Sequence, residues 1–145
     1  MKEEKMKFVK VKGGDLERIV NKVIKVAIDY EEKTGRSLGV TGEVGELKVC
    51  TRLKLRFLVD SRNAGFDAVD VKGSLYQIKA CRNNTGNQGK VGKFSKHEFD
   101  CAILAILGRR YELLELWKAS REELEPVLKR AKGRNPNIAS FKGVS

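Results

Sequence analysis

The chain has 145 residues, of which 41% are hydrophobic and 34% charged, a balance typical of one folded domain and unlike that of a disordered chain. Thirty Lys and Arg stand against nineteen Asp and Glu, and the net charge of +11 favours polyanionic partners. The same surplus also suits an acidic membrane surface, an acidic protein or a solvated thermostable surface. The chain has no apolar run of about 18 residues and a charged start over residues 1–12, which predicts a cytoplasmic protein without a membrane span.

The first elements in chain order are a short strand and a long helix. Residues 7–11 have the composition of an edge strand or a frayed arm. Apolar residues recur every three or four positions over about residues 15–33, which predicts an amphipathic helix. Asp15 is the expected N-cap, and Gly35 suits the C-terminal stop.

A second helix is expected over about residues 42–54, with Thr41 as its cap. Gly42 and Gly45 are poor helix formers inside this segment. Their presence predicts that another part of the chain approaches the helix backbone closely.

The periodicity then changes from helical to alternating. Residues 65–71 and 75–82 read as two strands joined by a tight turn at residues 72–74. Residues 83–96 are polar and rich in glycine, which predicts a loop.

The second half of the chain continues with apolar segments. Residues 99–107 are almost wholly apolar, a pattern that fits a buried strand or a short buried helix. Residues 111–117 read as a strand, and Ser120 with Glu123 predicts a capping box for a helix that ends near residue 132. Pro126 would lie inside that helix, so the helix either kinks or begins nearer Glu125.

We expect one domain over residues 1–145. Its parts are a basic arm over residues 1–14, a core over about residues 15–132 and a basic tail over residues 133–145. The tail has a possible short strand at residues 138–141. The cysteines and the single histidine are scattered, which excludes a structural zinc site of the usual spacing.

The two strands of the expected hairpin carry polar residues on one face. Alternation places Gln77 and Lys79 on the same face of their strand. If the turn has three loop residues, Val71 pairs with Leu75 and Asp67 lies directly opposite Lys79. One interpretation is a plain cross-strand ion pair. The functional interpretation is a metal site, in which Asp67 and the Gln77 amide oxygen bind Mg²⁺ or Mn²⁺ and Lys79 stabilises phosphate charge.

The pattern Glu43 … Asp67 … Gln77-Ile78-Lys79 resembles the PD-(D/E)XK nuclease superfamily over about residues 41–118. It is similar to archaeal Holliday-junction resolvases and to a family of small nuclease-like domains with a G-E-x-G-E helix and a Q-I-K strand. The resemblance implies a restriction-endonuclease-like α/β fold, with a central mixed β-sheet flanked by α-helices. It also implies Mg²⁺-dependent hydrolysis of DNA phosphodiester bonds.

The resemblance assigns a role to each matching residue. Asp67 would be the central metal ligand, Gln77 would occupy the (D/E) position and Lys79 the Lys position of the motif. Glu43 would be the helix carboxylate, with Glu46 one turn later as the substitute. The simpler interpretation of both glutamates is that acidic residues favour helix N-termini.

Two positions depart from the family pattern. Phe66 stands where the motif has Pro, and Gln77 replaces an acidic ligand, which removes one negative charge from the metal site. The alternatives to an active nuclease are therefore a weaker metal site or a module that only binds nucleic acid.

Polar and basic residues beside the hairpin are candidates for phosphate contacts. The simpler interpretation of the loop is an ordinary solvated segment. The candidate nucleic-acid-binding residues are Arg62, Asn63, Arg82, Asn83, Asn84, Lys90, Lys93 and Lys96.

The sequence therefore predicts a metal-dependent endonuclease acting on duplex or branched DNA. A single active site per chain cuts both strands most easily as a two-fold dimer, so we expect a homodimer. The competing hypotheses are a non-catalytic nucleic-acid-binding module on the same fold and a basic RNA-associated protein.

Overall fold

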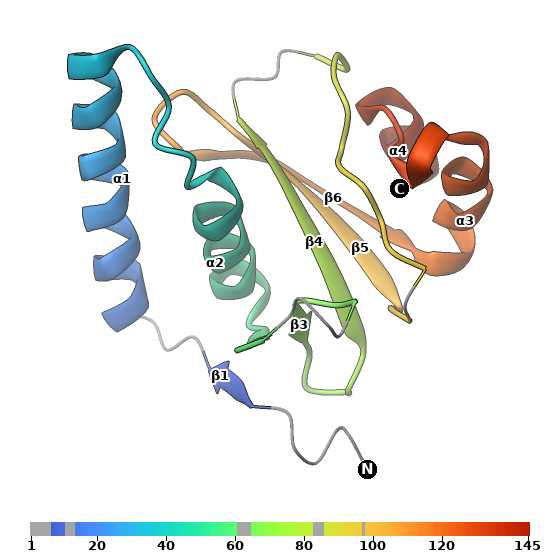
Figure 1. Cartoon of the computed structure of the whole chain (residues 1–145). Helices are drawn as coiled ribbons and strands as arrows, with labels where there is room; N and C mark the ends of the chain where they lie inside the picture. The colour runs from blue at the N-terminus through green and yellow to red at the C-terminus, as the bar shows by residue number, and fades with distance from the viewer. Residues whose placement is uncertain (1–6, 11–13, 61–64, 83–85, 97) are drawn as a thin grey trace.

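A computed structural model describes residues 7–10, 14–60, 65–82, 86–96 and 98–145. These residues form a six-stranded mixed sheet and four α-helices (Figure 1). In chain order the elements are β1 (Phe8–Lys10), α1 (Asp15–Thr34), α2 (Thr41–Leu53), β2 (Arg56–Leu58), β3 (Ala68–Val69), β4 (Leu75–Arg82), β5 (Cys101–Leu107), β6 (Leu113–Ser120), α3 (Arg121–Arg130), the 3₁₀ turn η2 (Lys132–Arg134) and α4 (Ile138–Val144).

The six strands lie side by side in chain order, from β1 at one edge to β6 at the other. Strands β4 and β5 are parallel, and every other neighbouring pair in this sheet is antiparallel. The prediction of an α/β protein with a mixed sheet flanked by helices is therefore confirmed at this level.

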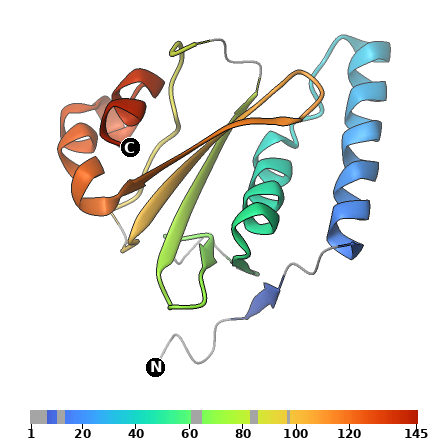
Figure 2. The same cartoon turned by 180° about the vertical axis from the view of Figure 1, so that it is seen from behind.

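The helices form layers on both faces of the sheet. Helices α1 and α2 lie on one side of β4 and β5, and α3 and α4 lie on the other (Figures 1 and 2). Tyr76 and Ile78 pack in the cluster that contains α2, whereas Leu104 and Phe141 pack in the cluster on the opposite face. Because β5 is covered on both faces, its sequence is a continuous apolar run and not an alternating one.

Several elements match their sequence-based predictions. The strand predicted at residues 75–82 is β4 with the same bounds, and the apolar run at 99–107 contains strand β5. Helix α3 begins at Arg121, since Ser120 and Glu123 form the predicted capping box; the alternative start near Glu125 is therefore wrong. The helix continues through Pro126.

The predicted caps of the first two helices are wrong. Gly14 precedes α1 with a φ of 115°, so Asp15 becomes the first helical residue and pairs with Arg18 instead. Val40 precedes α2, and Thr41 is already helical. The Gly35 stop is confirmed, because Gly35 adopts the left-handed conformation that glycine favours.

The possible strand at residues 138–141 is a helix, α4. The Asn137 side chain accepts a hydrogen bond from the Ser140 backbone N–H at 2.8 Å, which caps the first turn. Ile138 and Phe141, one turn apart, are both fully buried against the sheet. The segment after residue 133 therefore contributes a helix to the core.

Helix α2 approaches strand β4 at Gly45. A Cβ atom added to Gly45 would lie 2.3 Å from the Cβ of Ala80, well inside van der Waals contact. Gly42 has open space around it. The predicted close approach to the helix backbone is therefore confirmed at Gly45 and wrong at Gly42.

Among the described residues, none of the helices has the length and apolar character needed to cross a membrane.

The two glycines of α2 provide a matched pair of substitutions. Gly45→Ala forces α2 away from β4, so the free energy of unfolding should fall by about 1–3 kcal/mol. Gly42→Ala should raise it by up to about 1 kcal/mol, because alanine has the higher helix propensity and meets no neighbour. Urea denaturation of both variants measures the difference, and equal effects would contradict the close contact.

Candidate functional site

The register of the β3–β4 hairpin differs from the predicted one. Val69 pairs with Leu75 and Ala68 with Tyr76, so the loop has five residues, not three. The predicted placement of Asp67 opposite Lys79 is therefore wrong by two residues, and the position opposite Asp67 belongs to Gln77. Because side chains alternate with a period of two, this shift leaves Asp67 on the predicted face.

Asp70 explains the longer loop. Its Oδ1 accepts hydrogen bonds from the backbone N–H groups of Lys72 and Ser74, at 2.9 Å each, and its Oδ2 accepts one from the Tyr76 hydroxyl at 3.1 Å. Gly73 has a φ of 88°, which glycine adopts without strain. The side chain of Asp70 thus satisfies donors inside the loop and ends the strand early.

Asp67 lies where β3 separates from β4. Its backbone N–H still donates to the Tyr76 carbonyl at 2.7 Å. The next donor of β4, the Ile78 N–H, binds the Asp67 side chain at Oδ2, also at 2.7 Å. A carboxylate therefore takes the place that a backbone carbonyl holds in a continuous antiparallel ladder.

Gln77 lies beside this carboxylate. Its Nε2 donates to Asp67 Oδ2 at 3.1 Å. With the amide nitrogen engaged there, the other end of the side chain amide is its oxygen, Oε1, an acceptor. The pair therefore offers oxygen atoms at the edge of β4, as the metal hypothesis requires.

Glu46, on helix α2, interacts electrostatically with Asp67. It is half-buried, and burial raises its pKa from 4.5 to about 7, with further contributions from the negative charges of Asp67 and Glu43. Glu43 is exposed. Of the two glutamates, Glu46 is thus the half-buried one, and its charge interacts with that of Asp67.

Lys79 faces the segment over residues 86–96, which we call the covering segment. Its Nζ donates to the Lys93 carbonyl at 2.7 Å and lies 5.1 Å from the centre of the Phe94 ring. Burial lowers its pKa, although the Asp67 charge acts in the opposite direction. Gly92 lies against the aliphatic part of Lys79, where an added Cβ would be 3.3 Å from Cδ.

The covering segment is attached to the region around η2 and α4. Its backbone N–H groups at Val91 and Phe94 donate to the carbonyls of Pro136 and Arg134, at 2.9 and 3.0 Å. Phe94 is fully buried and its ring lies 6.4 Å from that of Phe141. The sequence predicted a polar, glycine-rich loop over residues 83–96 but not its attachment to the C-terminal segment. The spacing of Ile138 and Phe141 was the available signal for the helix that holds it.

The candidate phosphate-binding residues fall into three groups. Lys90, Lys93 and Lys96 are exposed on the covering segment. Arg82 pairs with Glu31 at 2.8 Å and stacks over the Tyr111 ring at 4.1 Å, and its side chain is only 9% exposed. Outside the described residues lie Arg62, Asn63, Asn83 and Asn84.

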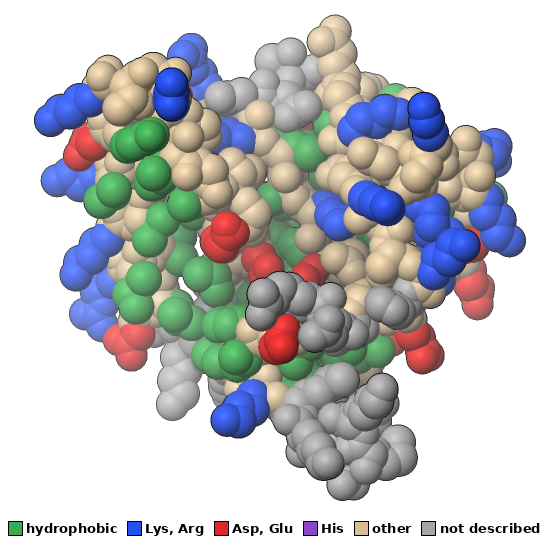
Figure 3. All heavy atoms as spheres, viewed as in Figure 1, with side chains coloured by type: hydrophobic (Ala, Val, Ile, Leu, Met, Phe, Trp, Pro, Cys, Tyr) green, Lys and Arg blue, Asp and Glu red, His purple; other side chains and the backbone are tan. Residues whose placement is uncertain are grey.

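The distribution of charge on this face is uneven. Acidic side chains gather near its middle, between α2 and the covering segment, and Lys and Arg side chains lie on both flanks (Figure 3). An acidic centre repels phosphate, whereas the basic flanks attract it. A cation at the centre would remove the repulsion.

The donor chemistry suits a hard cation, because Asp67, Gln77 and Glu46 all offer oxygen. Within the described part of the chain, no group of three or more His, Cys, Asp or Glu side chains is already placed to hold a metal ion. A bound ion would therefore take few protein oxygens and keep several waters, as Mg²⁺ commonly does.

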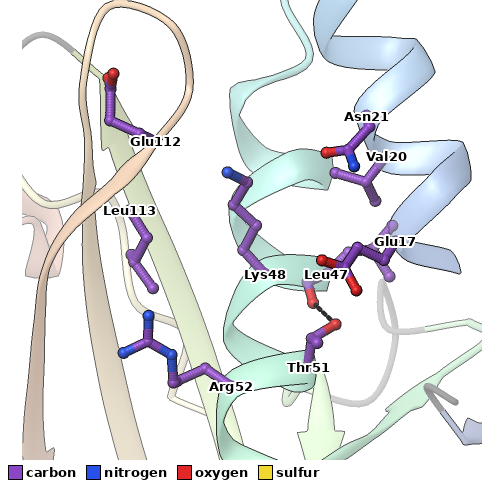
Figure 4. Close-up of a pocket in the computed structure, with 9 residues that line it drawn as sticks. All are labelled: Glu17, Val20, Asn21, Leu47, Lys48, Thr51, Arg52, Glu112 and Leu113. Atoms are coloured by element: carbon purple, nitrogen blue, oxygen red, sulfur yellow. Dashed lines mark hydrogen bonds between the residues drawn. The ribbon is translucent and has the colours of Figure 1, made fainter. Parts of the chain in front are cut away.

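A separate pocket of about 320 Å³ lies between α1, α2 and the start of β6 (Figure 4). Its lining includes two cationic side chains, Lys48 and Arg52, and two carboxylates, Glu17 and Glu112. Because this lining has both signs of charge and includes none of the predicted site residues, we do not assign it to the chemistry of the β3–β4 hairpin. It is lined by Glu17, Val20, Asn21, Leu47, Lys48, Thr51, Arg52, Glu112 and Leu113.

No protein-family model matches this chain, and a search of curated proteins finds no match either. The functional argument therefore depends on the geometry and electrostatics of the chain itself.

The raised pKa of Glu46 predicts a pH dependence of stability. Between pH 4.5 and about 7 the folded state binds more protons than the unfolded state, so stability falls as pH rises through this window. Glu46→Gln removes that loss. At about pH 8 we expect the free energy of unfolding of the variant to exceed that of the wild type by roughly 1–3 kcal/mol. Near pH 4.5 the two should be close.

Urea denaturation across this pH range measures the effect. Glu122→Gln, at an exposed position of α3, is the matched control and should leave the profile unchanged. A constant difference between Glu46→Gln and wild type at every pH would contradict the assignment.

Proposed function

We propose that this protein is a divalent-metal-dependent endonuclease that hydrolyses phosphodiester bonds in duplex or branched DNA. The observation that carries the proposal is the placement of the Asp67 carboxylate. It lies at the point where β3 leaves β4, bound to Gln77 and facing the charge of Glu46. The Asp67–Gln77 pair and the charge of Glu46 on α2 together support a cation site in this proposal.

The charge balance supports a metal at this place. The mutual repulsion of Glu43, Glu46 and Asp67 contributes to the raised pKa of Glu46. The Lys79 ammonium donates to a backbone carbonyl and not to one of these carboxylates. Mg²⁺ or Mn²⁺ would supply the missing positive charge, polarise a phosphate oxygen and lower the pKa of a bound water.

The residues of the chain have distinct roles in this proposal. Asp67 and Gln77 hold the ion through side-chain oxygens, with Glu46 as the carboxylate from the helix. Lys79 lies beside them and would stabilise phosphate charge. The exposed lysines of the covering segment, Lys90, Lys93 and Lys96, contact phosphates of the DNA backbone.

The resemblance of the Glu43 … Asp67 … Gln77-Ile78-Lys79 pattern to PD-(D/E)XK nucleases supports the same function. A mixed sheet with helices on both faces agrees with the restriction-endonuclease-like fold that this resemblance implies. In our proposal the fold is of that kind, and the active protein is a homodimer in the cytoplasm.

One observation favours a second candidate, a nucleic-acid-binding module without catalysis. The Lys79 ammonium is already bound to the Lys93 carbonyl beneath the covering segment. A nuclease would need this amine to reach phosphate, whereas a binding module would not. The replacement of an acid by Gln77 points in the same direction.

A cleavage panel distinguishes the two candidates. Linear duplex, single strand, flap, four-way junction and RNA are incubated with Mg²⁺, Mn²⁺ or EDTA. We expect cleavage of DNA only with the divalent ions, and a loss of at least about 100-fold in Asp67→Asn and Lys79→Ala. Asp67→Asn retains a side-chain oxygen as the acceptor for the Ile78 N–H, so its fold should persist.

Glu122→Gln serves as the control with full activity, and each variant is checked by thermal unfolding. Retained cutting in both site variants would reject this site. Salt-sensitive DNA binding with no cleavage in any metal would favour the binding module.

The exposed lysines of the covering segment give a separate prediction about DNA binding. Lys90→Ala, Lys93→Ala and Lys96→Ala should each weaken DNA binding and reduce the slope of log affinity against log salt by about one. Lys93→Ala keeps the backbone carbonyl that binds Lys79. Lys25→Ala on α1 is the control, and an equal loss in all four variants would contradict a localised surface.

A further inference from the structure

Helix α1 carries more apolar surface than its own packing uses. Val20 and Ala27 are buried in the cluster that joins α1 to α2. On the adjacent side of the helix, Ile19 is 53% exposed, Val26 58% and Tyr30 38%. Figure 3 shows hydrophobic side chains along the side of α1 in this view. At about 100° per residue the apolar arc of α1 spans roughly 200°, about twice what a core-facing helix needs.

The three exposed residues, together with half-buried Val23 at the margin of the α1–α2 cluster, follow the spacing of a coiled-coil seam. Ile19, Val23, Val26 and Tyr30 are separated by steps of four, three and four residues, which is the alternation of heptad a and d positions. We call these four residues the α1 seam. Helix α1 has 20 residues, or about 30 Å, long enough for the whole seam to contact one partner helix.

The charges beside the seam are self-complementary. One flank is buried against α2, and the other carries Lys22 and Asp29, which are exposed and seven residues apart. In an antiparallel pair of α1 helices, the register that brings Val23 onto Val26 of the second copy also brings Ile19 onto Tyr30. The same register places Lys22 next to Asp29 of the second copy.

We propose that a second copy of this chain docks antiparallel on the α1 seam, and that the dimer has two-fold symmetry. The two-fold axis passes between Val23 and Val26, so every contact occurs twice, as an isologous interface requires. The inference depends on α1 alone and does not rest on the proposed nuclease function. The apolar order and the charge order of α1 both match those of a second, antiparallel copy.

A single helix pair is a small interface. It lies below the area of standard stable complexes, so the dimer should be weak and dependent on concentration. Sedimentation velocity of the full chain from about 1 to 200 µM should therefore show a monomer–dimer equilibrium with a dissociation constant in the micromolar range.

Two α1 variants test the seam. Val26→Glu introduces two charges into the interface and should raise the dissociation constant by more than about 10-fold. Asn21→Glu adds the same charge on the opposite side of α1 and should leave the dissociation constant unchanged. Thermal unfolding confirms that both variants fold.

A charge exchange tests the antiparallel register. Lys22→Asp and Asp29→Lys each create two like-charge contacts and should weaken the dimer at low salt. The double variant restores both pairs in exchanged order and should recover the wild-type dissociation constant.

A chain that stays monomeric at every concentration overturns the proposal, as does a dimer that tolerates Val26→Glu. A dimer lost in Val26→Glu but not recovered by the exchange overturns the register. DNA cleavage is not a readout here, so the loss of the α1 dimer would leave the proposed metal site untouched, and the loss of cleavage would leave the α1 seam untouched.

Discussion

The distance between α2 and the sheet depends on one residue without a side chain. Gly45 lies on Ala80 so closely that a single added carbon would overlap it. This contact brings the half-buried face of α2 down onto β4, and Glu46 is the residue next to Gly45 in that helix. A larger residue at position 45 would lift the helix and move the Glu46 carboxylate away from Asp67. The electrostatic coupling at the candidate site is therefore a consequence of backbone packing.

The second constraint is the hydrogen-bonding demand of β4. Where β3 departs, the Ile78 N–H needs an acceptor, because an unpaired donor at this partly buried edge costs free energy. The Asp67 carboxylate satisfies it, and the same bond fixes that carboxylate beside Gln77. Asp67 therefore has a structural role in the sheet in addition to the metal-binding role that we propose for it.

The sequence predicted which face of a strand each residue lies on, because that face follows from the local alternation of side chains. The face shared by Asp67 and Gln77 was correct despite a register error, because a shift of two residues preserves the alternation of a strand. The loop length was wrong because Asp70 binds backbone donors within the loop, a contact that hydrophobic periodicity does not record. The partner of Lys79 was not predictable either, since it is a backbone carbonyl brought from residue 93 by packing against α4. Main-chain acceptors leave no signature in residue type.

The attachment of the covering segment has a consequence for how the protein is made. The Lys93 carbonyl reaches Lys79 only while the segment is held by Arg134, Pro136 and α4. A ribosome synthesises residues 134–141 after all of the acidic residues and Lys79. The nascent chain therefore cannot hold the covering segment over Lys79 until this late stretch has left the exit tunnel. Completion of the site is therefore ordered in time, with the lysine covered last.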